Sequence, residues 1–352
     1  MTPVYLYKHI PPLNDKKYKR YLTVKKPWPS PAGALLDIVG LRAEYSRPIM
    51  IQCETANICT NDCIICAYRK MTRKKMVMPM AIFEKVLRDY SDMGGGYLSL
   101  TPKMGDIFCD TLLPRRLEAA KRYPAIRSLS VTTNAILADR YDDDALRQIL
   151  AGFRRIQVSV YGLGAEEYRL ITRRDEYARM VRNAGRMLRL ADRGRTEIVF
   201  GFRFLKRHTD EEIRQWMTEN FGTEVAYGKT LTFMDWNGAL DDREPLPFDA
   251  KWKARAVNTG YCISPLVACV VFSNGDVTVC LCNDYDGREE LNLGNVAGRP
   301  LLELLNSQKA RDFWAGKPRY ASVCRHCSSH RAIANFQKYE YVFDDPVAYL
   351  GA

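Results

Sequence analysis

The segment IMIQCETANICTNDCIICAY (residues 49–68) contains three closely spaced cysteines, Cys59, Cys63 and Cys66. The apolar residues at its start predict a short buried strand over 49–55, so the three cysteines belong to the loop after that strand. Three thiolates on one loop can hold three irons of a 4Fe–4S cluster, whose full set of ligands is four cysteines. One iron is then left without a protein ligand and can bind and activate a small molecule.

The Cys-x-x-x-Cys-x-x-Cys spacing resembles the signature of the radical S-adenosylmethionine (SAM) enzymes. The resemblance implies that the amino and carboxylate groups of SAM chelate the open iron. It also implies that the reduced cluster cleaves SAM to methionine and a 5′-deoxyadenosyl radical. A zinc loop is the alternative, but zinc sites usually combine a close cysteine pair with a second pair or with histidines. A lone three-cysteine loop directly after a strand fits zinc poorly.

Length and composition indicate an ordinary globular chain. Its 352 residues suffice for one large domain and a smaller one, and 47% of them are hydrophobic. No apolar run reaches the roughly 18 residues of a membrane span, and the N-terminus lacks the apolar core of a signal peptide. We therefore expect a cytoplasmic protein. Eleven cysteines, an odd number, then favour metal binding or catalysis over a disulfide framework.

The net charge of +12 favours an acidic partner or substrate through long-range attraction. A solvated basic surface is the alternative interpretation, and no nucleic-acid-binding motif is present. The basic residues gather in two stretches: Lys16, Lys17, Lys19, Arg20, Lys25 and Lys26, then Arg69, Lys70, Arg73, Lys74 and Lys75.

Strand-like and helix-like segments alternate along the first two thirds of the chain. Apolar strands that alternate with amphipathic helices predict a parallel sheet covered by helices. Six such units suit the partial (β/α)6 barrel of the radical SAM family better than a closed eight-stranded barrel. The predicted strands are 49–55, 97–102, 127–134, 155–162, 196–206 and 225–234, and the predicted helices are 79–93, 113–123, 142–153, 177–193 and 210–221.

This pattern predicts four regions. Residues 1–48 are rich in Pro and Lys and form an irregular basic extension, 49–240 form the radical SAM core, and 336–352 form a tail. Residues 241–335 form a second, metal-bearing module. It contains a hairpin over 268–282, whose Asn274-Gly275 pair predicts a type I′ turn, and a helix over 299–314.

The C-terminal module resembles the SPASM/twitch domains of radical SAM enzymes, in which a cysteine is followed by a glycine and, five positions later, another cysteine. Cys262, Gly275 and Cys280 match that pattern, and Cys324 with Cys327 completes a set of four. Because the dense cysteine run of a full SPASM domain is absent, the resemblance implies one auxiliary 4Fe–4S cluster bound by these four cysteines. Zinc accepts the same ligands and is the alternative. Cys269 and Cys282 are spare, although Cys282 is near enough in sequence to replace Cys280.

The resemblance also implies a set of SAM contacts. Gly105-Asp106 corresponds to the family's Gly-Gly-Glu motif, with a shorter carboxylate at the position that binds the amino group of methionine. Polar side chains at strand ends suit the ribose hydroxyls and the carboxylate of SAM, and ordinary strand-end capping is the alternative. Arginine binds carboxylates in a bidentate manner. The expected SAM-site residues are Ile65, Tyr68, Gly105, Asp106, Thr133, Asn134, Ser159, Arg173 and its competitor Arg203.

Cys109 follows the Gly105-Asp106 motif on a loop expected to face the SAM site. A thiol there could donate a hydrogen atom to a substrate radical, which would make the enzyme an epimerase. The alternative is that Cys109 is a small buried hydrophobic residue.

These observations predict a radical SAM oxidoreductase or related radical-transfer enzyme that abstracts hydrogen from a substrate C–H bond. The first hypothesis for its substrate is a ribosomally made peptide, with a separate leader-recognition protein. A second is dehydrogenation or epimerisation of a sugar, aminocyclitol or nucleoside. The third is a non-catalytic iron–sulfur or zinc-binding interaction protein. A flavodoxin or ferredoxin is the expected reductant.

Overall fold

A computed structural model describes residues 48, 50–240, 245–255, 257–258, 262, 264–314 and 321–330. The predicted N-terminal extension, apart from Pro48, and the predicted C-terminal tail lie outside the described residues.

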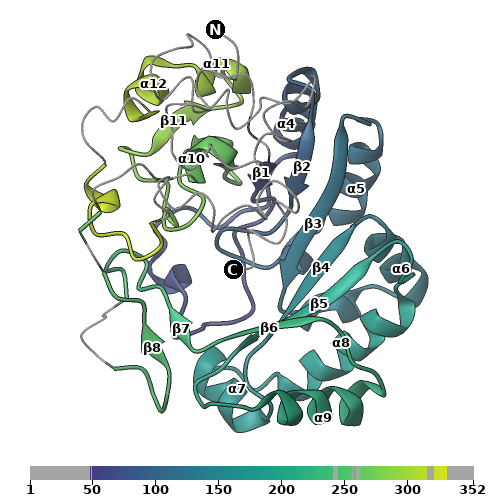
Figure 1. The fold of residues 1–352 in the computed structure, drawn as a ribbon. Coiled ribbons are helices and arrows are strands. Elements are labelled where there is room, and N and C mark those ends of the chain that lie inside the picture. Colours follow the sequence, from purple (N-terminus) through teal and green to yellow (C-terminus); the bar gives the residue numbers. More distant parts are fainter. Residues whose placement is uncertain are drawn as a thin grey trace, which may run out of the picture.

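A parallel sheet of six strands forms the core of the fold, in the order β1-β2-β3-β4-β5-β6 (Figure 1). These strands are β1 (Met50–Cys53), β2 (Gly96–Ser99), β3 (Ile126–Thr133), β4 (Arg155–Val160), β5 (Glu197–Arg203) and β6 (Tyr227–Thr230). Because all six are parallel, their carboxyl ends lie along one edge of the sheet, and the cysteine loop begins at the end of β1. This arrangement confirms the predicted α/β class with a parallel sheet.

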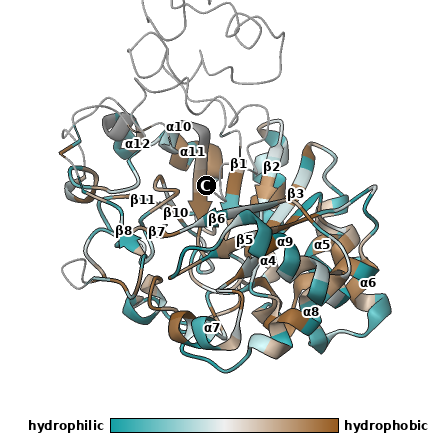
Figure 2. Cartoon of the chain, turned by 60° about the horizontal axis from the view of Figure 1, so that its bottom comes forward, coloured by the Kyte–Doolittle hydropathy of each residue, from teal (hydrophilic) through white to brown (hydrophobic). Residues whose placement is uncertain are grey.

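Helices follow the strands and cover the outer side of the sheet (Figure 1). Each packs against its neighbour, α4 on α5, α5 on α6, α6 on α8 and α8 on α9. They carry hydrophobic residues toward the sheet and hydrophilic residues toward solvent (Figure 2). The helices are α4 (Met80–Asp92), α5 (Leu113–Lys121), α6 (Asp143–Ala151), α7 (Ala165–Thr172), α8 (Tyr177–Leu190) and α9 (Asp210–Phe221), with short 3-10 turns η2 (Ala67–Lys70), η3 (Ile107–Cys109) and η4 (Ile136–Arg140).

The C-terminal segments add three strands to this sheet on the side of β1. Strand β9 pairs parallel with β1, and β10 and β11 then add antiparallel, so that the sheet has nine strands in the described part of the chain. The elements are β9 (Ala268–Val271), β10 (Asp276–Thr278), β11 (Asn292–Asn295), α10 (Ser264–Val267), α11 (Leu301–Leu305), α12 (Gln308–Trp314) and η5 (Ser322–Cys324). A separate pair, β7 (Thr232–Phe233) and β8 (Lys251–Trp252), follows β6.

The hairpin over 268–282 is present, but its turn is not of type I′. Gly275 has φ of +91°, whereas Asn274 is absent from the residues with positive φ, and type I′ requires positive φ at both central positions. The amide of Gly275 donates to the carbonyl of Phe272 at 2.8 Å, which closes a four-residue turn that ends at this glycine. Among the described residues, no helix is long and apolar enough to cross a membrane.

Candidate functional site

The cysteine loop brings three buried or half-buried thiols together at the carboxyl end of β1. Burial raises the pKa of the Cys59 thiol well above its ordinary value, and the charges of Asp106, Cys63 and Cys66 raise it further. Burial likewise raises the pKa of Cys66, which the amide of Tyr68 and the charge of Arg203 lower in part. The three thiols therefore share one water-poor region that already contains a cation.

Hydrogen bonds fix this loop from both sides. The amides of Asp62 and Ile64 donate to the last carbonyls of α7, those of Thr172 at 3.0 Å and Ile171 at 2.8 Å. The hydroxyl of Tyr68 accepts from the amide of Cys59 at 3.0 Å, which ties the first cysteine to the second residue after the third. Among the described residues, no three His, Cys, Asp or Glu side chains converge on one point as ligands of a single ion do. Cluster ligands need not converge in that way, because each thiolate binds its own iron.

The loop after β2 touches the cysteine loop at Gly105. Its φ is +148°, and a β-carbon there would lie 2.7 Å from the carbonyl oxygen of Ala56 and 2.9 Å from that of Ile58. The next amide, of Asp106, donates to the Ile58 carbonyl at 2.8 Å. Only glycine permits this close approach of the two backbones.

The carboxylate of Asp106 is buried and already has protein partners. It accepts hydrogen bonds from the hydroxyl of Thr133 at 2.8 Å and from the amides of Asn134 at 2.7 Å and Phe108 at 3.0 Å. Burial raises the pKa of this carboxyl, and the same three donors lower it in part. Asp106 therefore joins the end of β3 to the loop that touches the cysteines.

Two more of the predicted polar residues lie at the carboxyl ends of β3 and β4. The side-chain amide of Asn134 donates to the hydroxyl of Thr60 at 3.0 Å and lies 3.8 Å from the sulfur of Cys59. Ser159 is buried near the end of β4, where its hydroxyl accepts from the guanidinium of Arg203 at 3.0 Å.

The structure separates the two candidate arginines. Arg203 lines the cavity described below, and its charge lowers the pKa values of Cys63 and Cys66. Arg173 caps the end of α7 with φ of +55°, is 45% exposed, and lies 4.0 Å from the carboxylate of Asp62. Arg203 therefore acts on the thiols through its charge. Arg173 instead contacts Asp62 of the cysteine loop.

The C-terminal cysteines form a second group. Burial raises the pKa of Cys324, and the charges of Cys280, Cys262 and Cys327 raise it further. The pKa of Cys327 rises to about 12, through burial and then through Cys280 and Cys282. All four predicted ligands are therefore neighbours, and Cys282 is a fifth.

Asparagines hold this second group together. The amide nitrogen of the Asn283 side chain lies 2.8 Å from the sulfur of Cys327, and its backbone amide lies 3.3 Å from the sulfur of Cys280. The side chain of Asn258 donates to the carbonyls of Cys324 at 2.8 Å and Cys327 at 3.1 Å. Sequence patterns did not single out Asn258.

Lys103 and Trp236 lie between the two cysteine groups. The ammonium of Lys103 donates to the carbonyls of Leu281, at 2.5 Å, and Cys282, and its charge lowers the pKa values of both Cys66 and Cys280. The indole of Trp236 donates to the carbonyl of Ile65 at 3.0 Å. The sequence offered no signal for Trp236, while Lys103 stands two positions before the predicted Gly105 and was not assigned a role.

A buried ion pair joins the end of β1, the loop after β2 and the C-terminal hairpin. Glu54 is fully buried and binds the guanidinium of Arg73 through two hydrogen bonds, at 2.6 and 3.0 Å. Its oxygens also accept from the amide of Met104 at 2.9 Å and the hydroxyl of Ser273 at 3.1 Å. Arg73 therefore belongs to the interior and not to a solvated basic surface.

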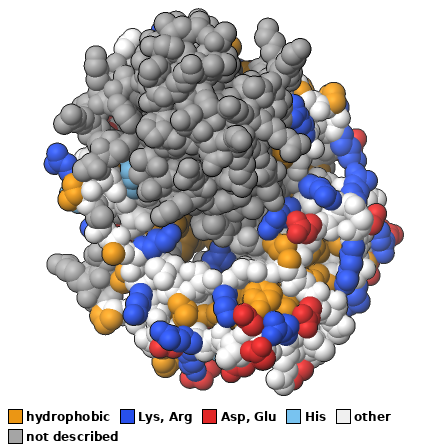
Figure 3. Space-filling view, in the orientation of Figure 1, with side chains coloured by type: hydrophobic (Ala, Val, Ile, Leu, Met, Phe, Trp, Pro, Cys, Tyr) orange, Lys and Arg blue, Asp and Glu red, His pale blue; other side chains and the backbone are white. Residues whose placement is uncertain are grey.

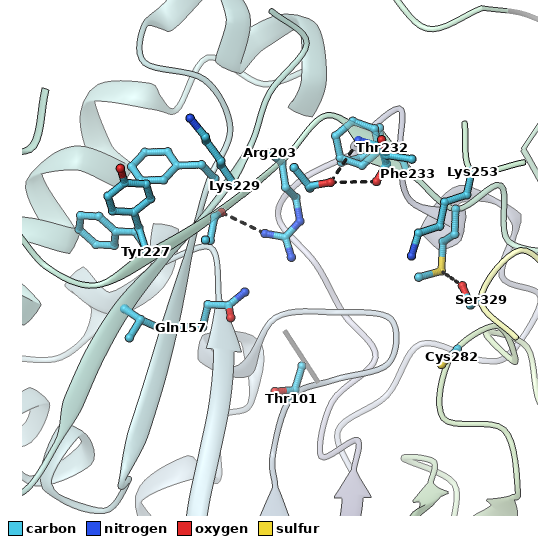
Figure 4. A pocket seen from close by; sticks show the side chains of 18 of the residues that line it. Thr101, Gln157, Arg203, Tyr227, Lys229, Thr232, Phe233, Lys253, Cys282 and Ser329 are labelled. Atoms are coloured by element: carbon cyan, nitrogen blue, oxygen red, sulfur yellow. Dashed lines mark hydrogen bonds between the residues drawn. The ribbon is translucent and has the colours of Figure 1, made fainter. Parts of the chain in front are cut away.

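A cavity of about 700 Å³ extends between the two cysteine groups (Figure 4). Ile65 lines it from the cysteine loop, Thr101 from the loop after β2, Gln157 from β4, and Cys282 and Ser329 from the C-terminal segments. Cys109 is not among the lining residues. It is 7% exposed within the core and burial raises its pKa to about 12, which matches the alternative of a small buried hydrophobic residue.

Comparison with known proteins agrees with this geometry. The radical SAM superfamily model matches residues 53–219, and the model of an iron–sulfur cluster-binding domain, SPASM, matches residues 262–328. The chain belongs to the radical SAM superfamily. It is a radical SAM enzyme whose cofactors are SAM and a 4Fe–4S cluster, with auxiliary iron–sulfur in its SPASM domain.

Solved structures of radical SAM enzymes share the fold at low sequence identity. SuiB of Streptococcus suis, bound to the precursor peptide SuiA, has a TM-score of 0.58 at 14% identity, covering 92% of this chain and 82% of that one. BtrN in complex with AdoMet and 2-DOIA has a TM-score of 0.50 at 16% identity, covering 80% and 93%. Native anSMEcpe with bound AdoMet also has 0.50, at 15% identity, covering 86% and 99%.

One curated relative is similar over part of its length. The probable GTP 3′,8-cyclase of Methanothermobacter thermautotrophicus is 33% identical over 139 residues, which are 39% of this radical SAM chain. The match spans 43% of that relative, less than half of its length.

Proposed function

We propose that this radical SAM enzyme modifies a ribosomally made peptide by abstracting hydrogen from one of its C–H bonds. The observation that carries the proposal is the cavity of about 700 Å³, which is lined both by the cysteine-loop residue Ile65 and by Cys282 and Ser329 of the C-terminal segments. A substrate in it would lie between the two cysteine groups. The fold shared with SuiB, which binds the precursor peptide SuiA, supports a peptide substrate.

Cys59, Cys63 and Cys66 are the proposed ligands of the SAM-binding cluster. The donor set fits the group, because three thiols share one buried region that also contains Arg203. When bound, the cluster and SAM supply a 5′-deoxyadenosyl radical. Among SAM contacts we favour Arg203 over Arg173, since Arg203 lines the cavity and is held by the hydroxyl of Ser159 at 3.0 Å.

Gln52 is a further candidate for binding in the cavity. Its side-chain oxygen is buried and has no hydrogen-bond partner in the described part of the chain, while its nitrogen donates to the carbonyl of Thr101 at 2.9 Å. A buried acceptor without a donor costs about 1–3 kcal/mol, so the site favours a ligand that supplies an N–H or O–H group. The ammonium of SAM and a peptide amide both have that chemistry.

Four C-terminal cysteines, Cys262, Cys280, Cys324 and Cys327, are the proposed ligands of one auxiliary 4Fe–4S cluster. With four cysteine ligands, this cluster would have no open iron to bind the substrate. Anaerobically reconstituted protein would then contain about eight irons per chain, against about four for a single cluster.

The test is the formation of 5′-deoxyadenosine and of modified peptide. Reconstituted enzyme with SAM and dithionite should release 5′-deoxyadenosine, and a precursor peptide encoded beside this gene should change mass by the hydrogens lost. Release of 5′-deoxyadenosine without any mass change in such a peptide would reject the peptide while keeping the radical chemistry. No 5′-deoxyadenosine from enzyme with intact clusters would reject both.

A small-molecule substrate is the second candidate. The partial similarity to the probable GTP 3′,8-cyclase and the fold shared with BtrN in its complex with 2-DOIA favour it. Product analysis with nucleotides and aminocyclitols in place of the peptide separates the two candidates.

A further inference from the structure

The lining of the cavity carries positive charge only. Its charged members are Lys103, Arg155, Arg203, Lys229 and Lys253, and none of the lining residues is Asp or Glu. A cavity lined by one sign of charge attracts ligands of the opposite sign. On the described part of the surface, by contrast, Asp and Glu are interspersed among Lys and Arg (Figure 3).

Three of these cations already have other roles. Arg155 pairs with Glu197 at 3.4 Å and Lys229 with Asp210 at 2.8 Å, so both are neutralised within the protein. Arg203, beside the thiols of the cysteine loop, is our candidate for the carboxylate of SAM. The charge available to a substrate therefore comes from Lys103 and Lys253.

Lys253 is anchored at the C-terminal side of the cavity. It follows β8 directly, and its amide donates to the carbonyl of Phe233 at 2.7 Å, so the backbone is fixed by the pairing of β7 with β8. Its side chain reaches toward the cavity from the side of Ser329 and Cys282 (Figure 4). Within the described part of the chain, no carboxylate lies at ion-pair distance from its ammonium group.

Lys103 lies at the same end of the cavity, where it contacts the C-terminal lining residues. Two of its three N–H groups donate to the carbonyls of Leu281 and Cys282, which holds the charge in place next to the C-terminal lining. Because this side chain is already fixed, ligand binding does not cost the conformational entropy that ordering a mobile lysine would cost.

We infer that the end of the cavity between Lys253 and Lys103 binds an oxyanion of the substrate. Under the proposed function, on which this inference rests, that group is the carboxylate of an Asp or Glu near the residue that is modified. The phosphate of a nucleotide has the same chemistry, and the experiment distinguishes the two sources.

Binding can be measured on reconstituted enzyme with SAM, under anaerobic conditions, by isothermal titration calorimetry. The peptide probes are acetyl-(Gly-Glu)4-amide and acetyl-(Gly-Gln)4-amide, and the nucleotide probes are GTP and guanosine. The variants are Lys253→Gln and Lys253→Arg. Lys251→Gln is the matched control, because Lys251 is exposed on the same short strand and does not line the cavity.

We expect Lys253→Gln to weaken binding of one charged probe about three- to fivefold, the range of a partly exposed ion pair. Lys251→Gln and Lys253→Arg should leave it within twofold, and the uncharged partner of that probe should bind weakly to every variant. Loss for the Glu peptide identifies a carboxylate, and loss for GTP a phosphate. Equal weakening by Lys251→Gln, or no effect of Lys253→Gln on either charged probe, would overturn the inference. Formation of 5′-deoxyadenosine in the same samples reports on the proposed function separately.

Discussion

The ammonium group of Lys103 donates a hydrogen bond to the backbone carbonyl of Cys282, a residue 179 positions away. This contact links the loop that follows β2 to the second cysteine group. The charge of Lys103 lowers the pKa values of Cys66 and of Cys280, one residue in each group. A charge that stabilises a thiolate also stabilises the reduced, more negative form of a cluster bound by it.

Lys103→Gln should therefore lower the reduction potentials of both clusters. A shift on the order of 50 mV is expected for the loss of one partly buried charge near each cluster. Potentiometric titration followed by electron paramagnetic resonance measures it. Lys103→Arg keeps the charge and should keep both potentials near those of the parent, whereas unchanged potentials in Lys103→Gln with intact clusters would contradict the prediction.

Gly105→Ala should prevent assembly of the SAM-binding cluster. The new β-carbon would lie 2.7 Å from the carbonyl of Ala56, and φ of +148° is unfavourable for alanine, so the cysteine loop must move. We expect iron to fall from about eight to about four per chain, with loss of 5′-deoxyadenosine formation. Gly298→Ala is the control, because nothing lies within 4 Å of a β-carbon there. Full iron content in Gly105→Ala would show that the loops tolerate the displacement.

Glu54→Gln should destabilise the whole fold. The ion pair with Arg73 is buried, with side-chain exposures of 0% and 9%, and removing one partner leaves an uncompensated charge. The free energy of unfolding should fall by about 3–5 kcal/mol, measured by denaturation of the metal-free protein. Glu118→Gln, which breaks an exposed pair with Lys121, should change it by at most about 1 kcal/mol. Similar losses in the two variants would mean that the buried Glu54 pair contributes no more to the free energy of unfolding than an exposed pair does.

Local patterns predicted most of the elements, and local competition explains the exceptions. The predicted strand 225–234 is divided after β6, because the hydroxyl of Thr230 bonds to both the carbonyl and the amide of Thr232 and turns the chain. The predicted helix 299–314 is divided into α11 and α12 at Asn306 and Ser307, where the hydroxyl of Ser307 accepts from the amide of Ala310 at 3.3 Å. Helix α7 was not predicted.

The cysteine spacing predicted where the site begins, but not what surrounds it. The contacts of Lys103 with Leu281 and Cys282, and of Trp236 with Ile65, join residues more than 170 positions apart. Such pairs depend on the path of the sheet and leave no periodic signal in the chain. The attachment of β9 to β1 is of the same kind, since a single strand pattern does not state its neighbour.

The choice between Cys280 and Cys282 as an auxiliary ligand can be tested directly. Cys280 raises the pKa values of both Cys324 and Cys327 and lies 3.3 Å from the amide of Asn283, whereas Cys282 affects Cys327 and has its sulfur 3.9 Å from the hydroxyl of Ser264. Cys280→Ala should therefore lose the auxiliary cluster and about four irons, and Cys282→Ala should keep them. Iron and sulfide counting with Mössbauer spectra separates the two outcomes. The reverse result would assign the ligand to Cys282, whose carbonyl Lys103 holds, and would place the cluster closer to the cavity that Cys282 lines.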